Sequence, residues 1–200
     1  MLKIRDKAIL SDLERFRAMT REQITQLHFT NVKHPVKESN AVLLRLKRDG
    51  YVAVSKERRM YTYFPHKHIK KDSTKLNHYL DIVSLYIDLN KHAKPYLFEV
   101  EPKLDSKGSP EPDVLLIWKN TVFFVELQRK HYSDKEWTGK MNRYETYYQS
   151  EKWKQLSFQP EKPIFPVVWI IGKGRGVANK QSFRCYNVTI EEMNSKLIKK

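Results

Sequence analysis

Apolar and polar positions divide the chain into a helical first third and a remainder in which helices and strands alternate. The first helix is expected to run from Ile4 to Phe16, with Ile4, Ala8, Leu10 and Leu13 as its apolar positions. The segment Thr20-Arg21-Glu22-Gln23 predicts the start of a second helix, because the Thr20 hydroxyl and the Gln23 amide can cap free backbone groups. A third helix is expected between about residues 37 and 48, before Asp49-Gly50.

Two β-prone runs follow the third helix, at residues 51–54 and 60–64, and a basic turn joins them. Three helices and a basic hairpin predict a winged helix-turn-helix domain over residues 1–66. The polar stretch at residues 67–73 has no clear period and is expected to be a linker.

The remainder, residues 74–200, predicts an α/β core, so that the chain is α+β overall. Helices are expected from Leu76 to Ile87 and, capped by Ser133 or Asp134, from residue 135 to about 150. Strands are expected at residues 96–101, 113–118, 121–128 and 166–171. The order α-β-β-β-α-β predicts three layers around a mixed sheet. A capping box at Thr189 begins a short C-terminal helix.

The hairpin within this core carries the clearest chemistry. If Lys119-Asn120 forms a two-residue turn, Asp113 lies directly across from Glu126, with Gln128 two residues further along the same face. Two facing carboxylates repel each other, and a bound cation relieves that repulsion. Oxygen ligands favour a hard ion, so the pattern indicates a site for Mg²⁺ or Mn²⁺.

Metal-dependent phosphodiester cleavage would give these residues separate roles. Asp113 and Glu126 would hold the cation, which lowers the pKa of a bound water. Gln128 would orient that water but carries no positive charge. A lysine is therefore expected as well, either Lys130 on the same strand face or Lys140 in the following helix.

Two points about this site stay open. A further acid is often needed, and the candidates are Glu99, Glu101 and Asp81. The alternative to a metal site is a strand end whose carboxylates meet only solvent or an arginine such as Arg129 or Arg143.

Composition points to a polyanionic partner. The chain has 38 Lys and Arg against 23 Asp and Glu, a formal net charge of +15. The first 75 residues hold 18 of these basic residues and 8 of the acidic ones. Double-stranded DNA is therefore expected as the partner, ahead of an anionic membrane surface. A second copy of the chain is a further candidate partner.

In a winged helix, the third helix enters the major groove and the wing reaches phosphates. The candidate DNA contacts are Lys33, Lys37, Ser39, Asn40, Arg45, Lys47, Arg48, Lys56, Arg58 and Arg59. The alternative is a solvated helix face on a domain that docks protein.

Two absences in the sequence bear on location. No apolar run approaches a membrane span and the N-terminus lacks a signal-peptide core, which predicts a cytoplasmic protein without a membrane partner. The lone Cys185 cannot form an internal disulfide or begin a zinc cluster.

The core resembles the PD-(D/E)XK nuclease superfamily. The resemblance is carried by Pro112-Asp113 and, thirteen residues on, by Glu126-Leu127-Gln128, with a helix on either side. It implies a restriction-endonuclease-like fold in which Asp113 and Glu126 hold the metal. The third motif residue is usually lysine, and this chain departs from the pattern with Gln128.

Nearly the whole chain is similar to the replication-relaxation family of plasmids and phages. The segments that carry this similarity are Met19–Ile24, Leu43–Leu46, Gly50-Tyr51, Pro112-Asp113, Glu126-Leu127 and Lys140–Tyr144. It implies a role in replication or maintenance of a mobile element, with other replication proteins as candidate partners. Three functions remain: a DNA endonuclease or nickase, a non-cleaving replication or copy-number protein on a decayed nuclease core, and a protein-docking adaptor.

Overall fold

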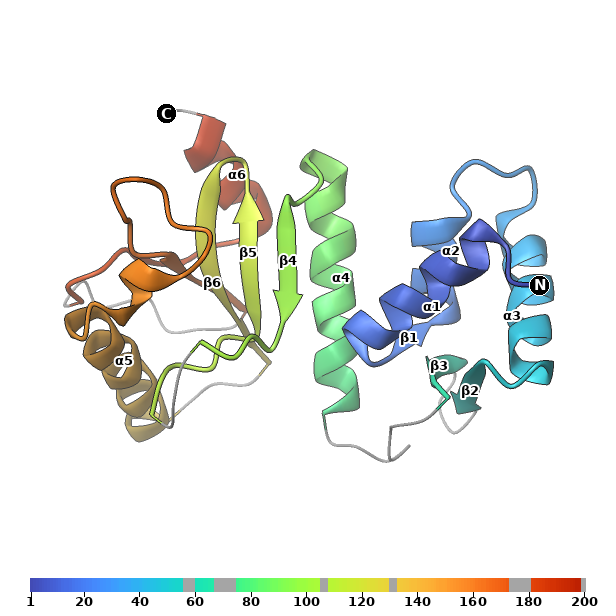
Figure 1. The fold of residues 1–200 in the computed structure, drawn as a ribbon, viewed down its shortest axis with the longest axis horizontal. Helices are drawn as coiled ribbons and strands as arrows, with labels where there is room; N and C mark the ends of the chain where they lie inside the picture. Colours follow the sequence, from blue (N-terminus) through green and yellow to red (C-terminus); the bar gives the residue numbers. More distant parts are fainter. Residues whose placement is uncertain (56–59, 67–74, 105–107, 130–132, 173–180, 199–200) are drawn as a thin grey trace. The chain divides into compact units, whose positions relative to one another are not determined.

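The computed structural model describes residues 1–55, 60–66, 75–104, 108–129, 133–172 and 181–198 (Figure 1). The chain forms two compact units, Met1–Asp88 and Leu89–Lys200. The division lies within helix α4 (Leu76–His92), later than the sequence suggests. The linker expected at residues 67–73 lies outside the described residues, so the domain limits stay predictions.

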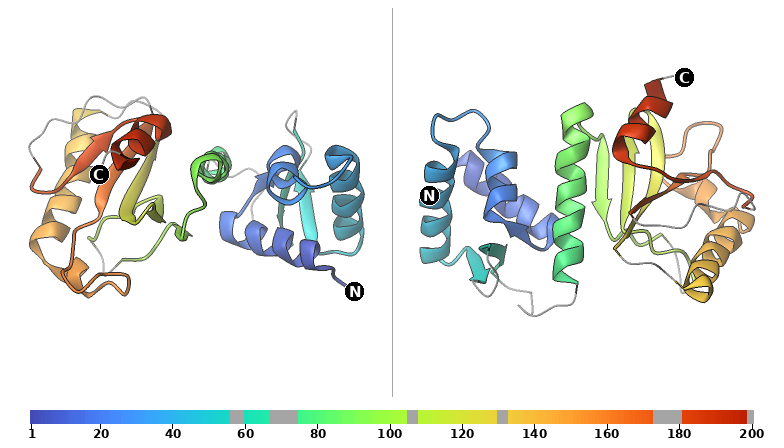
Figure 2. Two further views of the ribbon diagram at one scale, coloured as in Figure 1. Left: turned by 90° about the horizontal axis from the view of Figure 1, so that it is seen from above. Right: turned by 180° about the vertical axis from the view of Figure 1, so that it is seen from behind.

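The first unit combines helices with a small antiparallel sheet (Figures 1 and 2). Its helices before α4 are α1 (Ile4–Phe16), α2 (Arg21–His28) and α3 (Pro35–Arg48). Its strands are β1 (Met19–Thr20), β2 (Val52–Ser55) and β3 (Thr62–Pro65), in the order β1-β3-β2. The predicted helices and hairpin strands are thus confirmed within a few residues, whereas β1 is too short to leave a pattern in the sequence.

The cap of α2 has the predicted geometry. Thr20 Oγ1 accepts a hydrogen bond from the Gln23 backbone amide at 3.1 Å, and Gln23 Oε1 accepts one from the Thr20 amide at 2.9 Å. The apolar face of α1 was predicted correctly at Leu13 but wrongly at Ile4 and Ala8, which are exposed. The buried positions of α1 are Asp6, Ile9, Leu13 and Phe16, which recur every three or four residues.

The second unit is built on a mixed five-stranded sheet of order β4-β5-β6-β7-β8. Its strands are β4 (Leu97–Val100), β5 (Val114–Trp118), β6 (Thr121–Gln128), β7 (Val167–Gly172) and β8 (Cys185–Asn187). The pairs β4·β5 and β5·β6 are antiparallel, and β6·β7 and β7·β8 are parallel. The remaining elements are α5 (Asp134–Gln149), the 3-10 helix η1 (Lys152–Gln155) and α6 (Ile190–Ile198). The expected mixed sheet is confirmed.

The turn between β5 and β6 has the predicted length. Lys119 and Asn120 adopt positive φ angles of 47° and 59°, which is the conformation of a type I′ hairpin turn. The ladder then runs from Trp118 opposite Thr121 to Val114 opposite Val125. This confirms the register on which the facing of Asp113 and Glu126 was predicted.

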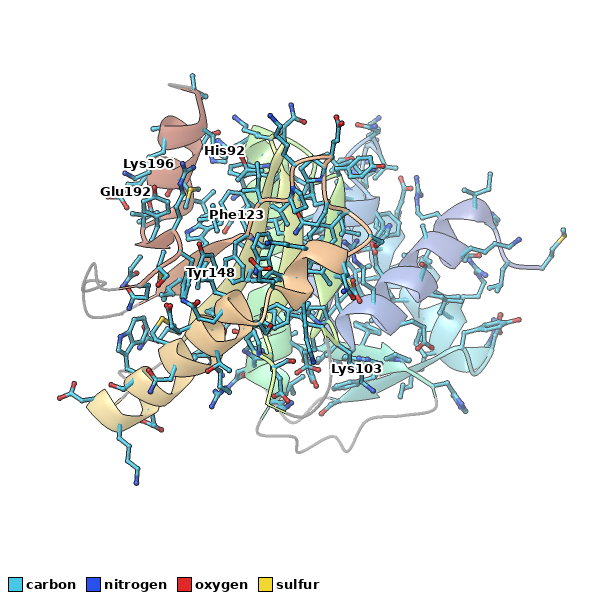
Figure 3. The ribbon with its side chains drawn as sticks, turned by 60° about the vertical axis from the view of Figure 1, so that its left-hand side comes forward. His92, Lys103, Phe123, Tyr148, Glu192 and Lys196 are labelled. Atoms are coloured by element: carbon cyan, nitrogen blue, oxygen red, sulfur yellow. The ribbon has the colours of Figure 1, made fainter. Side chains whose placement is uncertain are left out.

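The two faces of this sheet pack against different helices. Phe124, Val168 and Ile170 point toward α5 and form an aromatic-rich core with Met141 and Tyr144. Alternation along the strands turns Phe123, Val167 and Tyr186 to the opposite face, where Met193 of α6 packs. In Figure 3, Tyr148 marks α5 and Lys196 marks α6. The aromatic residues of α5 therefore belong to the core or pack against it.

No helix within the described ranges is long and apolar enough to cross a membrane.

Candidate functional site

The predicted acidic pair lies where β5 begins and β6 ends. Glu126 occupies β6 and pairs with Ile170 of the parallel neighbour β7. Asp113 lies one residue before the first residue of β5. Its backbone amide donates to the Val125 carbonyl at 3.0 Å, whereas in a regular ladder of this register the amide would turn away from β6 and toward β4, so the chain departs from ideal pairing at this residue.

The Asp113 carboxylate nevertheless reaches across to β6. Its Oδ2 accepts a hydrogen bond from the Leu127 backbone amide at 2.7 Å, next to Glu126 in the chain. The negative charge of Asp113 also acts on Glu126, whose pKa it raises. The two carboxylates are therefore brought to one place, as the hairpin register predicts.

Glu126 is almost completely buried, with 2% of its surface exposed. The Tyr144 hydroxyl donates to its Oε1 at 2.7 Å, and the Lys140 ammonium contacts its Oε2. Both partners come from α5, one turn apart on the face that packs against the sheet. Of the two predicted lysines, Lys140 thus lies in the site, whereas Lys130 lies outside the described residues.

Burial sets the protonation of this carboxylate. It raises the pKa of Glu126 from 4.5 to about 7, an effect that Lys140 opposes and Asp113 reinforces. Burial and the neighbouring Glu126 also hold the pKa of Tyr144 well above its ordinary value. The hydroxyl therefore stays protonated and donates a hydrogen bond to Glu126. Glu126 is therefore in balance between its charged and neutral forms near neutral pH.

Gln128 extends the site along the same strand face. It is 5% exposed, and its side-chain Oε1 has no hydrogen-bond partner within the described residues. A buried carbonyl oxygen left unpaired costs about 1–3 kcal/mol, so such an oxygen usually has a ligand or water. Gln128 pairs with Gly172 of β7, where a Cβ atom would lie 2.1 Å from the Gln128 backbone oxygen.

The donor set fits a hard divalent cation. Asp113, Glu126 and Gln128 offer two carboxylates and an amide oxygen, which are the ligands that Mg²⁺ and Mn²⁺ prefer. The described residues contain no cluster of three His, Cys, Asp or Glu side chains spaced for a metal. Such an ion would thus rely on the amide, on water or on the substrate phosphate for its other ligands.

The acids proposed as a third ligand are not brought into this group. The backbone of Glu101 lies beside that of Asp113, because the Glu101 amide donates a hydrogen bond to the Asp113 carbonyl at 2.9 Å. Glu99 is exposed on β4, and Asp81 belongs to the first unit. Sequence reasoning did not assign Tyr144 to the site, although its spacing of four residues from Lys140 places both on one helix face.

The structure gives two of the predicted DNA contacts on α3 partners within the first unit. Ser39 is fully buried, with Thr25 Oγ1 donating to its hydroxyl at 2.8 Å, so it faces the core together with Leu43 and Leu46. Arg45 donates to Asp6 Oδ1 at 2.7 Å and ties α3 to α1. Burial alone would raise the pKa of Asp6, but this hydrogen bond helps to hold it below its ordinary value.

The other predicted contacts on α3 form an exposed stripe together with Leu44, which was not among the predicted contacts. Its members share the outward face of the helix at intervals of three or four residues: Lys37, Asn40, Leu44, Lys47 and Arg48. Leu44 is 69% exposed in the middle of this stripe. Lys33 is exposed before the helix, and Lys56, Arg58 and Arg59 of the expected wing lie outside the described residues.

The buried carboxylate predicts a pH-dependent stability. A raised folded-state pKa means that Glu126 contributes stability below about pH 4.5, which is lost as the pH rises through about 7. In metal-free buffer, the free energy of unfolding of the wild type should therefore fall relative to Glu126→Gln across this range, by a few kcal/mol at about 1.4 per pKa unit. Urea titrations measure it, and parallel pH profiles for the two proteins would contradict the assignment.

Comparison with models of known protein families, with curated proteins and with solved structures returned no match.

Proposed function

We propose that this protein binds DNA through its first unit and cleaves a phosphodiester bond in its second, with a bound Mg²⁺ or Mn²⁺, in replication or maintenance of a plasmid or phage. The first unit is proposed to be a winged helix-turn-helix and the second a PD-(D/E)XK-type core. The observation that carries the proposal is the convergence of Asp113 and Glu126 beside the unpaired oxygen of Gln128.

Each side chain has a task that its contacts support. Asp113 and Glu126 would hold the cation, which when bound polarises the scissile phosphate and lowers the pKa of a water. Tyr144 and Lys140 fix the orientation of the Glu126 carboxylate through its two oxygens. Lys140 also favours the ionised form of Glu126 that a metal requires.

Gln128 is suited to orient the attacking water. Its buried Oε1 can accept one hydrogen bond from that water and so fix the direction of the attacking lone pair. It cannot remove a proton itself. Lys140 supplies the positive charge that the motif usually takes from its third residue, here from α5 instead of from β6.

The exposed stripe of α3 supports DNA binding. Lys37, Lys47 and Arg48 present cations for phosphates, and Asn40 can pair with an adenine edge. Leu44, exposed between them, can contact a thymine methyl group.

Neutralising this stripe should weaken DNA binding and its dependence on salt. For Lys37→Gln with Lys47→Gln, the slope of log affinity against log salt should decrease by about 2, because each phosphate contact contributes about 0.9. Fluorescence anisotropy with a labelled duplex at several salt concentrations measures the slope. The matched control is Lys162→Gln with Lys103→Gln, two exposed lysines of the second unit, whose slope should remain that of the wild type. Equal losses in both pairs would assign the binding to net charge alone.

Nicking of supercoiled plasmid tests the proposed reaction. The wild-type chain should convert the plasmid to its open circle with Mn²⁺ and stop when EDTA is added. Glu126→Ala, purified in parallel, should leave the plasmid intact and so exclude a contaminating nuclease. Activity that is equal in the two proteins, or no cleavage with either metal, would overturn the proposed reaction.

A second candidate function is non-cleaving DNA binding on a decayed nuclease core. It is favoured by Gln128 in place of the motif lysine, and by the contact of Lys140 with the carboxylate that would otherwise face the metal. Salt-sensitive duplex binding without nicking under Mg²⁺ or Mn²⁺ is the outcome expected of it.

A further inference from the structure

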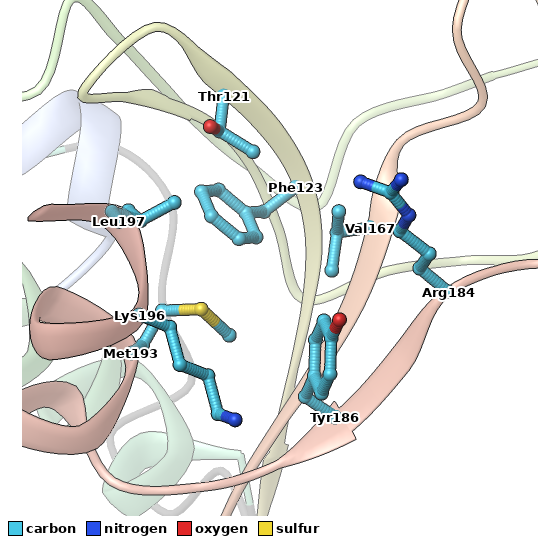
Figure 4. A pocket seen from close by; sticks show the side chains of 8 residues that line it. All are labelled: Thr121, Phe123, Val167, Arg184, Tyr186, Met193, Lys196 and Leu197. Carbon is cyan, nitrogen blue, oxygen red and sulfur yellow. The ribbon is translucent and has the colours of Figure 1, made fainter. Parts of the chain in front are cut away.

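A pocket opens on the face of the sheet opposite the acidic pair (Figure 4). Its volume is about 210 Å³, and it lies between α6 and strands β6, β7 and β8. Phe123, Val167, Met193 and Leu197 give it an apolar interior, with Thr121 and Tyr186 adding hydroxyl groups. The strand alternation that turns Glu126 toward α5 turns Phe123 toward this pocket, so the two sites share the sheet but no side chain.

Two positively charged side chains lie at the rim of this pocket. Arg184 precedes β8, and Lys196 projects from α6 with its ammonium 5.3 Å from the centre of the Tyr186 ring. None of the lining residues is acidic. Within the part of the chain that the structure describes, neither Arg184 nor Lys196 has an ion-pair partner. An anion at the rim would therefore meet two available charges without displacing a carboxylate.

The apolar interior of the pocket determines which uncharged group of a ligand can bind there. The partly exposed ring of Tyr186 favours a flat aromatic group over an aliphatic chain, and the fully buried Phe123 ring forms part of the apolar wall. The volume falls below the roughly 300 Å³ at which pockets for drug-sized ligands begin, so a ring fits inside but a larger cofactor does not. Anion and ring must also be joined over a short distance, because the cations line the same small opening.

We infer that this pocket binds a single nucleotide, with the base against the partly exposed Tyr186 ring and the phosphate between Arg184 and Lys196. A free mononucleotide and one unpaired nucleotide of a strand share this chemistry. The inference goes beyond the proposed cleavage reaction and does not depend on it, because no residue of the acidic pair contributes to the pocket.

The Met193 methyl group offers a local readout, because this side chain lines the pocket and is 2% exposed. The full chain, labelled with ¹³C at its methionine methyl groups, is titrated with thymidine monophosphate and with inorganic phosphate. The nucleotide should shift the Met193 signal with a Kd below about 1 mM, and phosphate should bind at least about tenfold more weakly. No response, or equal binding of the two, would mean an adventitious ion only and overturn the inference.

Variants separate the two halves of the ligand. Arg184→Gln with Lys196→Gln should weaken nucleotide binding by at least about tenfold, whereas the matched pair Lys103→Gln with Lys162→Gln should bind as the wild type does. Tyr186→Leu keeps apolar volume but removes the ring, so it should weaken binding of the nucleotide and not of phosphate. The other methionine signals report whether each variant is folded. A loss that is equal in both lysine-containing pairs would overturn the inference.

Two further titrations distinguish a free nucleotide from a nucleotide of a strand, and the pocket from the acidic pair. An oligothymidylate that binds more tightly than the monophosphate at Met193 assigns the pocket to a strand, and the reverse order assigns it to the free nucleotide. Asp113→Asn should bind the monophosphate like the wild type. Nucleotide binding without any plasmid nicking would leave this inference standing and remove the proposed reaction.

Discussion

Replacement of Asp113 by asparagine should lower metal-dependent nicking by at least about a hundredfold while the protein stays folded. Mutation of even the outer partners of a metal site costs about ten- to a hundredfold, and Asp113 is proposed as a direct ligand. Asparagine keeps an oxygen that can accept the hydrogen bond of the Leu127 amide, now 2.7 Å from Asp113 Oδ2. The substitution therefore removes the charge and keeps the local backbone contact.

The control for this prediction is an acid of the same unit away from the site. Asp134→Asn changes an exposed residue in the first turn of α5 and should nick at the wild-type rate. The unfolding midpoint of Asp113→Asn in urea should lie close to that of the wild type in metal-free buffer. Nicking by Asp113→Asn at the rate of the Asp134→Asn control would remove Asp113 from the mechanism.

Replacement of Gly172 by alanine should destabilise the protein by about 3 kcal/mol or more. Gly172 has a φ angle of 133°, a conformation that costs any other residue about 1–3 kcal/mol. An added Cβ would also lie 2.1 Å from the Gln128 backbone oxygen, so β6 and β7 must separate where they meet at the site. Nicking should fall as well, because Gln128 moves with that strand.

Gly139 provides the matched control for Gly172. It lies inside α5, and an added Cβ would meet no atom within 4 Å. Gly139→Ala should therefore stabilise the protein by about 1 kcal/mol, the difference in helix propensity between the two residues. Urea unfolding of both variants measures the contrast. If Gly172→Ala unfolded at the wild-type midpoint, the close approach of β6 and β7 would be contradicted.

The hairpin and its register could be predicted because they depend on local counting. A two-residue turn at Lys119-Asn120 fixes which residues face each other, and the structure keeps that register as far as Val114 and Val125. The detour of the chain at Asp113 could not be predicted. It depends on which carbonyl accepts the Asp113 amide, and the alternation of apolar residues carries no information about that choice.

The errors on α1 and α3 have a common cause. Ser39 and Asp6 are polar residues in buried stripes, each satisfied by a hydrogen bond from a distant element: Thr25 for Ser39 and Arg45 for Asp6. A pattern that assigns polar residues to the surface misplaces both. Strand β8 was missed for another reason, because its three half-buried residues are too few for a strand pattern.

Lys140 and Tyr144 show what long-range packing adds to a motif. The sequence offered Lys130 and Lys140 as alternatives, since strand and helix can each supply a lysine to one site. Docking of α5 on the sheet brings Lys140 to Glu126 and brings the Tyr144 hydroxyl with it. The burial that follows is what moves the pKa of Glu126 to about 7, and it has no signature in the sequence.

The chain divides between Asp88 and Leu89, so that mutations of the proposed DNA-contacting helix and mutations of the proposed reaction site fall in different units. All the side chains proposed to act on the phosphodiester bond come from the later unit, and the exposed stripe of α3 comes from the earlier one. If the chain binds and cleaves DNA as proposed, substitutions on that stripe will alter which DNA sequence is bound and leave the reaction unchanged. Lineages descended from such a protein could acquire new target sites by changing one helix.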